Sequence, residues 1–131
     1  SIRSPIWRHG GTVFGPRPRS YAFAMPKKQY RAALRAALSA KLASGSLVVV
    51  SALTLSDLKT RSLAKALHQL GLTSTALIVV GADRADLERA GRNLRGVKLI
   101  GPRELNVYDV LRYDSIVIPE REVPRIQEAW L

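Results

Sequence analysis

Apolar residues recur with helical spacing in the first long segment after residue 25. From Tyr30 to Leu42 they repeat every three or four positions, which places them on one face of a helix. Pro26 suits the first helical position, and Gly45 suits the position just past a helix end. The pattern predicts a helix over residues 26–44. Its apolar stripe consists of Tyr30, Ala33, Leu34, Ala37, Leu38 and Leu42.

Short β-branched runs alternate with helical segments through the rest of the chain. Strands are predicted over residues 47–53, 76–81, 97–101 and 115–119. Because each run is continuously apolar, we expect these strands to be buried on both faces of the sheet. Helices are predicted over residues 57–70, 84–94 and 107–113, with a last short helix over residues 123–130.

This alternation predicts an α/β fold, a three-layer α/β/α domain with a largely parallel four-stranded sheet and right-handed crossovers. Gly71 is expected to close the second helix, and Asp83 and Asn106 to cap the third and fourth. We assign residues 25–131 to this single globular domain. A chain of 131 residues buries about two thirds of its unfolded surface, which is enough for one core.

Residues 1–24, called the arm below, show neither a helical nor a strand period. They contain three prolines, three glycines and four arginines, with aromatic residues interleaved. Such a segment cannot bury itself, so we expect it to be extended or disordered alone and ordered by a partner. Tyr21 and Phe23 either stack on that partner or fix the arm to the domain. Because the sequence opens at Ser1 without an initiator methionine, we expect a piece of a longer protein.

Charge is distributed unevenly along the chain. Residues 1–56 carry nine lysines and arginines and no acidic residue, whereas residues 57–131 carry twelve basic and ten acidic residues. The net charge of +11 favours nucleic acid, an anionic membrane or an acidic protein as partner. Arginine outnumbers lysine fifteen to six, and its planar fork suits phosphate and base edges, which favours RNA. A targeting peptide is not indicated, because glycines and prolines between residues 10 and 18 break any helix there.

Several function classes lack the residues that they need. Apolar runs are too short to cross a bilayer, and the absence of cysteine excludes disulfides and thiolate metal sites. Neither the turn at residues 54–56 nor Gly81 belongs to a glycine-rich phosphate loop. His68 has no second ligand one helical turn away, and Asp109 and Asp114 fit a first helical turn and a loop. We therefore expect no enzyme, cofactor, metal site or small-molecule substrate.

The arm and the first helix carry the candidate binding residues. Trp7 beside Arg8 and Phe14 before a Gly-Pro pair suit stacking on unpaired bases and close passage along an RNA backbone. Like charges spaced four residues apart on the helix each cost roughly 0.2 to 0.5 kcal/mol, so we expect an anion opposite them. Trp130 is expected to pack in the core or an interface. The predicted RNA-binding residues are Arg3, Trp7, Arg8, His9, Gly10, Gly11, Phe14, Arg17, Arg19, Lys27, Lys28, Arg31 and Arg35.

A resemblance to a known family rests on several motifs that occur in order. Residues 3–21 read Arg-Ser-Pro-Ile-Trp-Arg-His-Gly-Gly-Thr-Val-Phe-Gly-Pro-Arg-Pro-Arg-Ser-Tyr. This segment resembles the signature of the universal large-subunit ribosomal protein L four family, in its bacterial form. The same family is matched at residues 26–28, 34–39, 59–61, 90–94 and 105–112. The match runs nearly to the C-terminus.

The resemblance implies an α/β body on the outer side of the large ribosomal subunit and a long loop that reaches between rRNA helices to the peptide exit tunnel. It implies no catalytic role. By analogy the arm is the returning half of that loop, with Arg3, Arg8, Arg17 and Arg19 on rRNA phosphates and Trp7 among bases. Members bind rRNA early in assembly, and some repress their own operon through its messenger leader.

Three departures from the family pattern are visible. The family's N-terminal segment and the outgoing half of its loop have no counterpart before Ser1. His9 stands where the first of three glycines is common, and Gly91 stands where alanine is usual. The expected partners are 23S-type large-subunit rRNA, neighbouring large-subunit proteins and the protein's own messenger leader, in a bacterial cytoplasmic or an organellar ribosome. The alternatives are a regulator that binds messenger RNA or DNA, and a small nucleotide-binding α/β enzyme.

Overall fold

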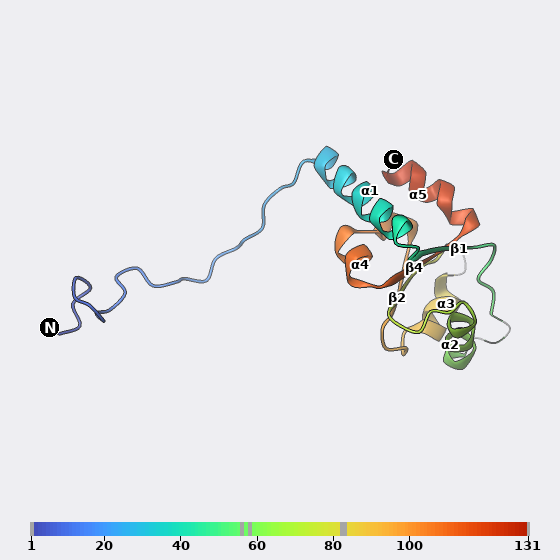
Figure 1. Ribbon diagram of the computed structural model, residues 1–131, viewed down its shortest axis with the longest axis horizontal. Coiled ribbons are helices and arrows are strands. Elements are labelled where there is room, and N and C mark those ends of the chain that lie inside the picture. Colours follow the sequence, from blue (N-terminus) through green and yellow to red (C-terminus); the bar gives the residue numbers. More distant parts are fainter. Residues whose placement is uncertain (1, 56, 58, 82–83, 131) are drawn as a thin grey trace.

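The computed structural model describes residues 2–55, 57, 59–81 and 84–130. An α/β body follows the arm, which leads away from it (Figure 1). The helices are α1 (Lys27–Ala43), α2 (Thr60–Gln69), α3 (Arg84–Gly91), α4 (Val107–Arg112) and α5 (Val123–Trp130), and the strands are β1 (Leu47–Val50), β2 (Ala76–Val79), β3 (Val97–Ile100) and β4 (Ser115–Pro119). Two 3₁₀ turns, η1 (Pro102–Glu104) and η2 (Glu120–Glu122), precede α4 and α5.

The four strands form a parallel sheet in the order β1-β4-β2-β3. The connections from β1 to β2 and from β2 to β3 run in one direction across the sheet, and the connection to β4 runs back. Because parallel crossovers share one hand, α2 and α3 lie on one face and α4 on the other. The predicted three-layer α/β fold with a parallel four-stranded sheet is confirmed.

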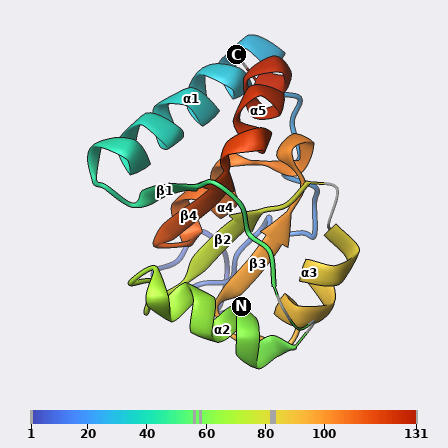
Figure 2. The ribbon, with the colours of Figure 1, turned by 90° about the vertical axis from the view of Figure 1, so that its right-hand side faces the viewer.

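The sheet separates two hydrophobic cores. Along β2, Leu77 and Val79 point toward α1, α4 and α5, whereas Ile78, and Val80 just after the strand, point toward α2 and α3. Figure 2 shows the same division, with α1 and α5 on one side of the sheet and α2 and α3 on the other. The alternation follows from strand geometry, since successive side chains leave a strand on opposite faces.

Burial on both faces is correct for the central strands and wrong for the edge strands. All four residues of β2 are buried, as are residues 116–119 of β4. In contrast, Val49 of β1 is 52% exposed and Lys98 of β3 is exposed. These strands are more exposed because an edge strand has a neighbouring strand on one side only. Strand β1 also ends at Val50, earlier than the predicted end at residue 53.

Most predicted helix ends are correct. Gly45 and Gly71 follow α1 and α2 with left-handed φ values of 68° and 75°, and the Asn106 side chain accepts a hydrogen bond from the Asp109 amide at 2.9 Å. The predicted cap Asp83 lies outside the described residues. Two predicted helix ends were wrong, because α2 begins only at Thr60 and α3 ends at Gly91. Within the predicted apolar stripe of α1, Ala33 and Leu42 are exposed.

The helix predicted over residues 84–94 ends at Gly91, a residue that packs closely against its neighbours. A Cβ atom at Gly91 would overlap the Leu99 side chain and lie 3.2 Å from Leu63 Cδ2. The family's alanine would therefore fit here only if the Leu99 side chain moved. Helices α2 and α3 pack together through the core that contains Leu63 and Ala90.

A buried carboxylate joins α4 to β3. Asp109 is 2% exposed and accepts hydrogen bonds from Lys98 Nζ and Asn106 Nδ2, each at 2.7 Å. Burial acts to raise the pKa of Asp109, but the hydrogen bonds and charges of its neighbours outweigh burial and lower that pKa. Asp109 was predicted only to complement the dipole of its helix. In the structure it also links α4 to the edge strand β3 through Lys98.

The lowered pKa predicts a dependence of stability on pH. The folded state binds the Asp109 proton more weakly than the unfolded state, so this stability is present above about pH 4 and is lost as pH falls through the folded pKa. Asp109→Asn should lower the free energy of unfolding at pH 7 by roughly 1 to 3 kcal/mol. The loss should shrink near pH 3, as measured by urea unfolding with circular dichroism. Glu128→Gln, at an exposed position, is the control, and an equal loss at both pH values would contradict the assignment.

Candidate nucleic-acid interface

The start of the arm is folded into a closed turn, residues 3–11, called the arm turn below. The Gly11 amide donates a hydrogen bond to the Arg3 carbonyl at 2.9 Å, and this bond joins the two ends. Inside it, the Trp7 amide donates to the Ser4 carbonyl at 2.9 Å and the Gly10 amide donates to the Trp7 carbonyl at 3.0 Å. The prediction of an extended arm did not anticipate this turn.

Two adjacent residues make the arm turn possible. His9 has φ 60°, a left-handed conformation that non-glycine residues seldom adopt. A Cβ atom at Gly10 would overlap the Ser4 carbonyl oxygen and lie 3.0 Å from the Trp7 carbonyl oxygen. Glycine, which is common in the family at the position of His9, adopts this left-handed conformation without steric cost. Histidine keeps the same turn at some conformational cost.

The arm turn presents its side chains outward. Trp7 is 59% exposed, and Arg3, Arg8 and His9 are exposed. Gly10 and Gly11 contribute the backbone that closes the turn. The exposed indole of Trp7 offers a flat stacking surface beside the positive charge of Arg8. Because the turn is already closed, binding through it loses less conformational entropy than binding through a free chain.

Residues 12–26 contain neither helix nor strand and carry the next predicted residues away from the body (Figure 1). Phe14 is 90% exposed, and Arg17 and Arg19 are exposed. The Arg19 guanidinium lies 3.7 Å from the centroid of the Tyr21 ring, a cation–π arrangement. Of the two alternatives for Tyr21 and Phe23, attachment to the domain does not occur, because both side chains are exposed.

Helix α1 continues the basic surface of the arm directly into the body. Lys27, Lys28, Arg31 and Arg35, called the α1 stripe below, are exposed, whereas Leu34 on the other side of the helix is buried. Lys41 differs from these residues because its Nζ donates to the carbonyls of Tyr113 and Asp114, at 2.8 and 3.1 Å. The structure thus arranges all the predicted binding residues along two consecutive segments, the arm and α1.

The N-terminal end of α1 is held by an aromatic contact. The ring centroids of Tyr30 and Trp130 are 5.6 Å apart with an interplanar angle of 50°, and Trp130 Nε1 donates to the Pro102 carbonyl at 3.0 Å. Trp130, predicted to pack in the core or an interface, is partly buried and packs against the core that contains Leu34 and Ile126. This contact lies close to the point at which the arm joins the helix.

A second group of exposed basic residues was missed from the sequence. Arg61, Lys65 and His68 are exposed along α2, and Arg89, Arg92 and Arg95 are exposed on and after α3. The spacing of four and three residues from Arg61 to His68 was the available signal, because it places the three side chains on one face of a helix. It was overlooked because the acidic residues of this half of the chain balance its overall charge.

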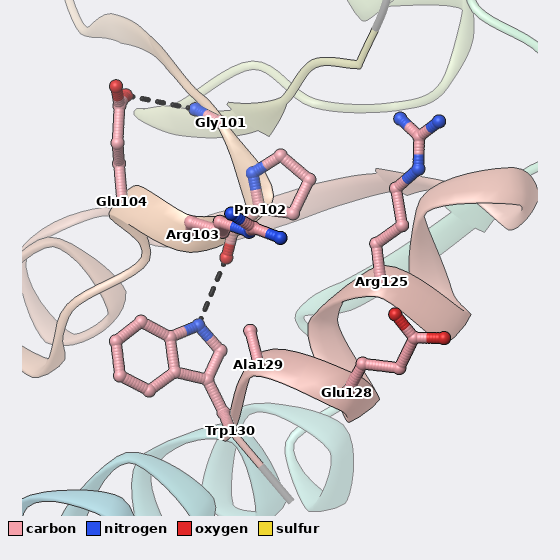
Figure 3. A pocket seen from close by; sticks show the side chains of 8 residues that line it. All are labelled: Gly101, Pro102, Arg103, Glu104, Arg125, Glu128, Ala129 and Trp130. Carbon is pink, nitrogen blue, oxygen red and sulfur yellow. Dashed lines mark hydrogen bonds between the residues drawn. The ribbon is translucent and has the colours of Figure 1, made fainter.

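A cavity of about 950 Å³ lies between η1 and α5. Its polar groups serve the fold, as Figure 3 shows: Glu104 accepts a hydrogen bond from the Gly101 amide at 3.1 Å, and Trp130 donates to the Pro102 carbonyl. Arg125, also on the lining, donates to both carboxylate oxygens of Glu122 at 3.1 and 3.2 Å. The cavity therefore shows no arrangement of a nucleophile with a base.

Gly81 has a packing role rather than a role in phosphate binding. Glu122 is buried, and a Cβ atom at Gly81 would overlap its carboxylate. Across residues 2–55, 57, 59–81 and 84–130, no three histidine, cysteine or acidic residues are grouped as metal binding requires. No helix within these ranges has the length and apolar character of a membrane span.

Comparison with known proteins assigns nearly the whole chain to one family. The model of the "Ribosomal protein L4/L1 family" matches residues 1–129. The chain belongs to the ribosomal protein L4/L1 family. The predicted resemblance is therefore confirmed, and the L4/L1 match includes the arm as well as the body.

Curated relatives include three bacterial proteins named "Large ribosomal subunit protein uL4". The protein of Koribacter versatilis is 45% identical over 129 residues, and those of Symbiobacterium thermophilum and Solibacter usitatus are each 46% identical over 128 and 129 residues. The alignments cover 98% of this chain but only 59%, 62% and 62% of the relatives. This L4/L1 chain thus spans about three fifths of the length of the relatives that it matches.

The arm turn of this L4/L1 chain predicts opposite results for two glycines. Gly10→Ala should open the turn, because a methyl group has no room beside the Ser4 carbonyl, whereas Gly15→Ala should not, since nothing lies within 4 Å of a Cβ there. The measurement is amide hydrogen exchange of Gly11 by NMR, which should speed up in Gly10→Ala only. Equal exchange in both variants would show that the turn does not depend on this close approach.

Proposed function

We propose that this chain is part of a structural constituent of the large ribosomal subunit and acts by binding and ordering large-subunit rRNA through the arm and the α1 stripe. The observation that carries the proposal is the continuity of this basic surface. Residues 1–56 contain no carboxylate, and the eight cations of the arm and the α1 stripe are all exposed. The names of the relatives support the ribosomal location.

The chemistry of the surface divides between its three parts. The arm turn offers the indole of Trp7 to an unpaired base, and the extended segment brings Arg17 and Arg19 along a backbone. The α1 stripe presents four cations to phosphates without base reading. Shape and backbone contacts therefore dominate, and affinity should fall steeply with salt because each contacted phosphate releases counterions.

The site supports a binding role rather than catalysis. Its aromatic and basic side chains provide stacking, charge and hydrogen-bond donors, and the relatives are named as ribosomal proteins. Neighbouring large-subunit proteins are the further expected partners. The part of the family's loop that would reach the peptide exit tunnel corresponds to the region before the arm turn, so the arm is directed toward the tunnel in this proposal.

The deciding experiment compares binding to 23S-type rRNA with binding to bulk competitor RNA over a salt series. The whole chain should bind rRNA tightly and resist competitor, and deletion of residues 1–24 should abolish that selectivity. Equal binding to every RNA would contradict the proposal and leave only a nonspecific basic surface. Retention of selectivity after deletion would move the site from the arm to the body.

A single phosphate contact is testable in the extended segment. Arg17→Ala should weaken binding to all RNAs about equally and lower the slope of log affinity against log salt by about 1. Arg103→Ala, which removes an exposed cation outside the proposed surface, should leave the slope unchanged. An unchanged slope in Arg17→Ala would remove Arg17 from the phosphate contacts.

Stacking by the arm turn has a different signature. Trp7→Ala should weaken rRNA binding by roughly 1 to 3 kcal/mol without changing the salt slope, and Trp7→Phe should retain most of the affinity, because any aromatic face stacks on a base. Tyr108→Ala is the matched control, since Tyr108 is an exposed aromatic residue on α4. If Trp7→Phe binds as weakly as Trp7→Ala, stacking is not the function of the indole.

A further inference from the structure

The exposed side of α2 carries two cationic side chains and a histidine in a row. Arg61, Lys65 and His68, called the α2 stripe below, are exposed, while Leu63 and Leu67 on the opposite side are buried. Helix α2 contains no acidic residue, and within the described part of the chain no ion pair joins the α2 stripe to a carboxylate. These charges repel one another along the helix without internal compensation.

The beginning of α2 adds to this imbalance. Lys59 occupies the N-cap position, its side chain makes no capping hydrogen bond, and the first turn carries no acidic residue. A cation at a helix N-terminus opposes the helix dipole, which favours negative charge there. The sequence of α2 therefore lowers the stability of the isolated helix, and an external anion along this face would offset the cost.

Arginines that follow the neighbouring helix add to the basic residues of this layer. Helices α2 and α3 pack side by side on the same face of the sheet (Figure 2). Arg92 and Arg95 come directly after α3 and are exposed, and residues 89–95 contain three arginines and no acidic residue. The basic residues of this layer thus include the segment just beyond α3 as well as α2.

We propose that the α2 stripe together with Arg92 and Arg95 is a second RNA-contacting surface, so that the body lies between two separate RNA segments. The α1 stripe is on the other layer of the domain, because α1 packs on one core and α2 on the other. One RNA segment therefore contacts the arm and α1, and another approaches from the side of α2 and α3. This inference rests on the proposed function and extends it to a bridging role.

The composition of the surface favours RNA over a protein partner. Protein interfaces centre on apolar and aromatic residues and are depleted in lysine. The outward positions of α2 carry Arg61, Ala64, Lys65 and His68, with no aromatic or large aliphatic side chain among them. Arginine and lysine are the main donors to phosphate oxygens, and such contacts need no apolar centre.

The absence of cysteine from the chain allows a direct test. Single cysteines at exposed positions carry a tethered iron–EDTA group that cleaves nearby RNA: Ala64→Cys within the α2 stripe, Ala32→Cys beside the α1 stripe, and Gln127→Cys on α5 for background cleavage. Each protein is bound to a 23S-type rRNA transcript, and the cleaved nucleotides are mapped by primer extension. Ala64→Cys and Ala32→Cys should each cleave above background, at different segments of the transcript.

The outcomes separate this inference from the proposed function. Cleavage from Ala32→Cys but only background cleavage from Ala64→Cys overturns the second surface alone, as expected if an acidic protein covers α2 instead. Absence of cleavage from both positions overturns the proposed rRNA contacts as well. Cleavage of one shared segment from both positions overturns bridging.

A charge-matched pair of variants gives a second readout. Arg61→Ala with Lys65→Ala should lower the slope of log affinity against log salt by about 1.5 to 2 on the full transcript. In the Ala64→Cys background the same pair should abolish cleavage. Arg103→Ala with Arg112→Ala removes two exposed positive charges elsewhere and should leave both measurements unchanged. If both pairs had the same effect, the α2 stripe would act only through the net charge of the protein, and the second RNA-contacting surface would be overturned.

Discussion

Burial of the two central strands on both faces is the constraint on which this structure depends. β2 and β4 bury nearly all their side chains, so apolar surface must cover the sheet from above and below. Helices α1, α4 and α5 cover one face, and α2 and α3 cover the other. A domain built in this way necessarily presents two outer helical surfaces to its surroundings, which a single-layer packing would not provide.

The positions of the charged side chains reflect this architecture. The cores contain few charged groups, and the buried carboxylates Asp109 and Glu122 are each paired with a neighbouring cation. Most remaining cations are displaced to the outer sides of the helices and to the arm. Because like charges repel one another, such a distribution favours binding of a polyanion, and binding to the folded state alone would raise the stability of the protein.

The sequence predicted the fold well because strand and helix periods, glycine ends and the Asn106 cap are local signals. It failed where a residue's environment depends on distant neighbours. The exposure of Val49 follows from the position of β1 at an edge, and the lack of space for a side chain at Gly91 follows from Leu99, a residue of β3. The same holds for the candidate site. The composition of residues 1–24 indicated the arm, but the hydrogen bond between Gly11 and Arg3 that closes its turn could be seen only in the structure.

The two ends of α1 show how the arm is mounted on the body. At one end Tyr30 contacts Trp130 of the last helix, and at the other Lys41 holds the carbonyls that lead into β4. A force applied to the arm would therefore be transmitted through α1 to the last helix at one end and to the residues that precede a central strand at the other.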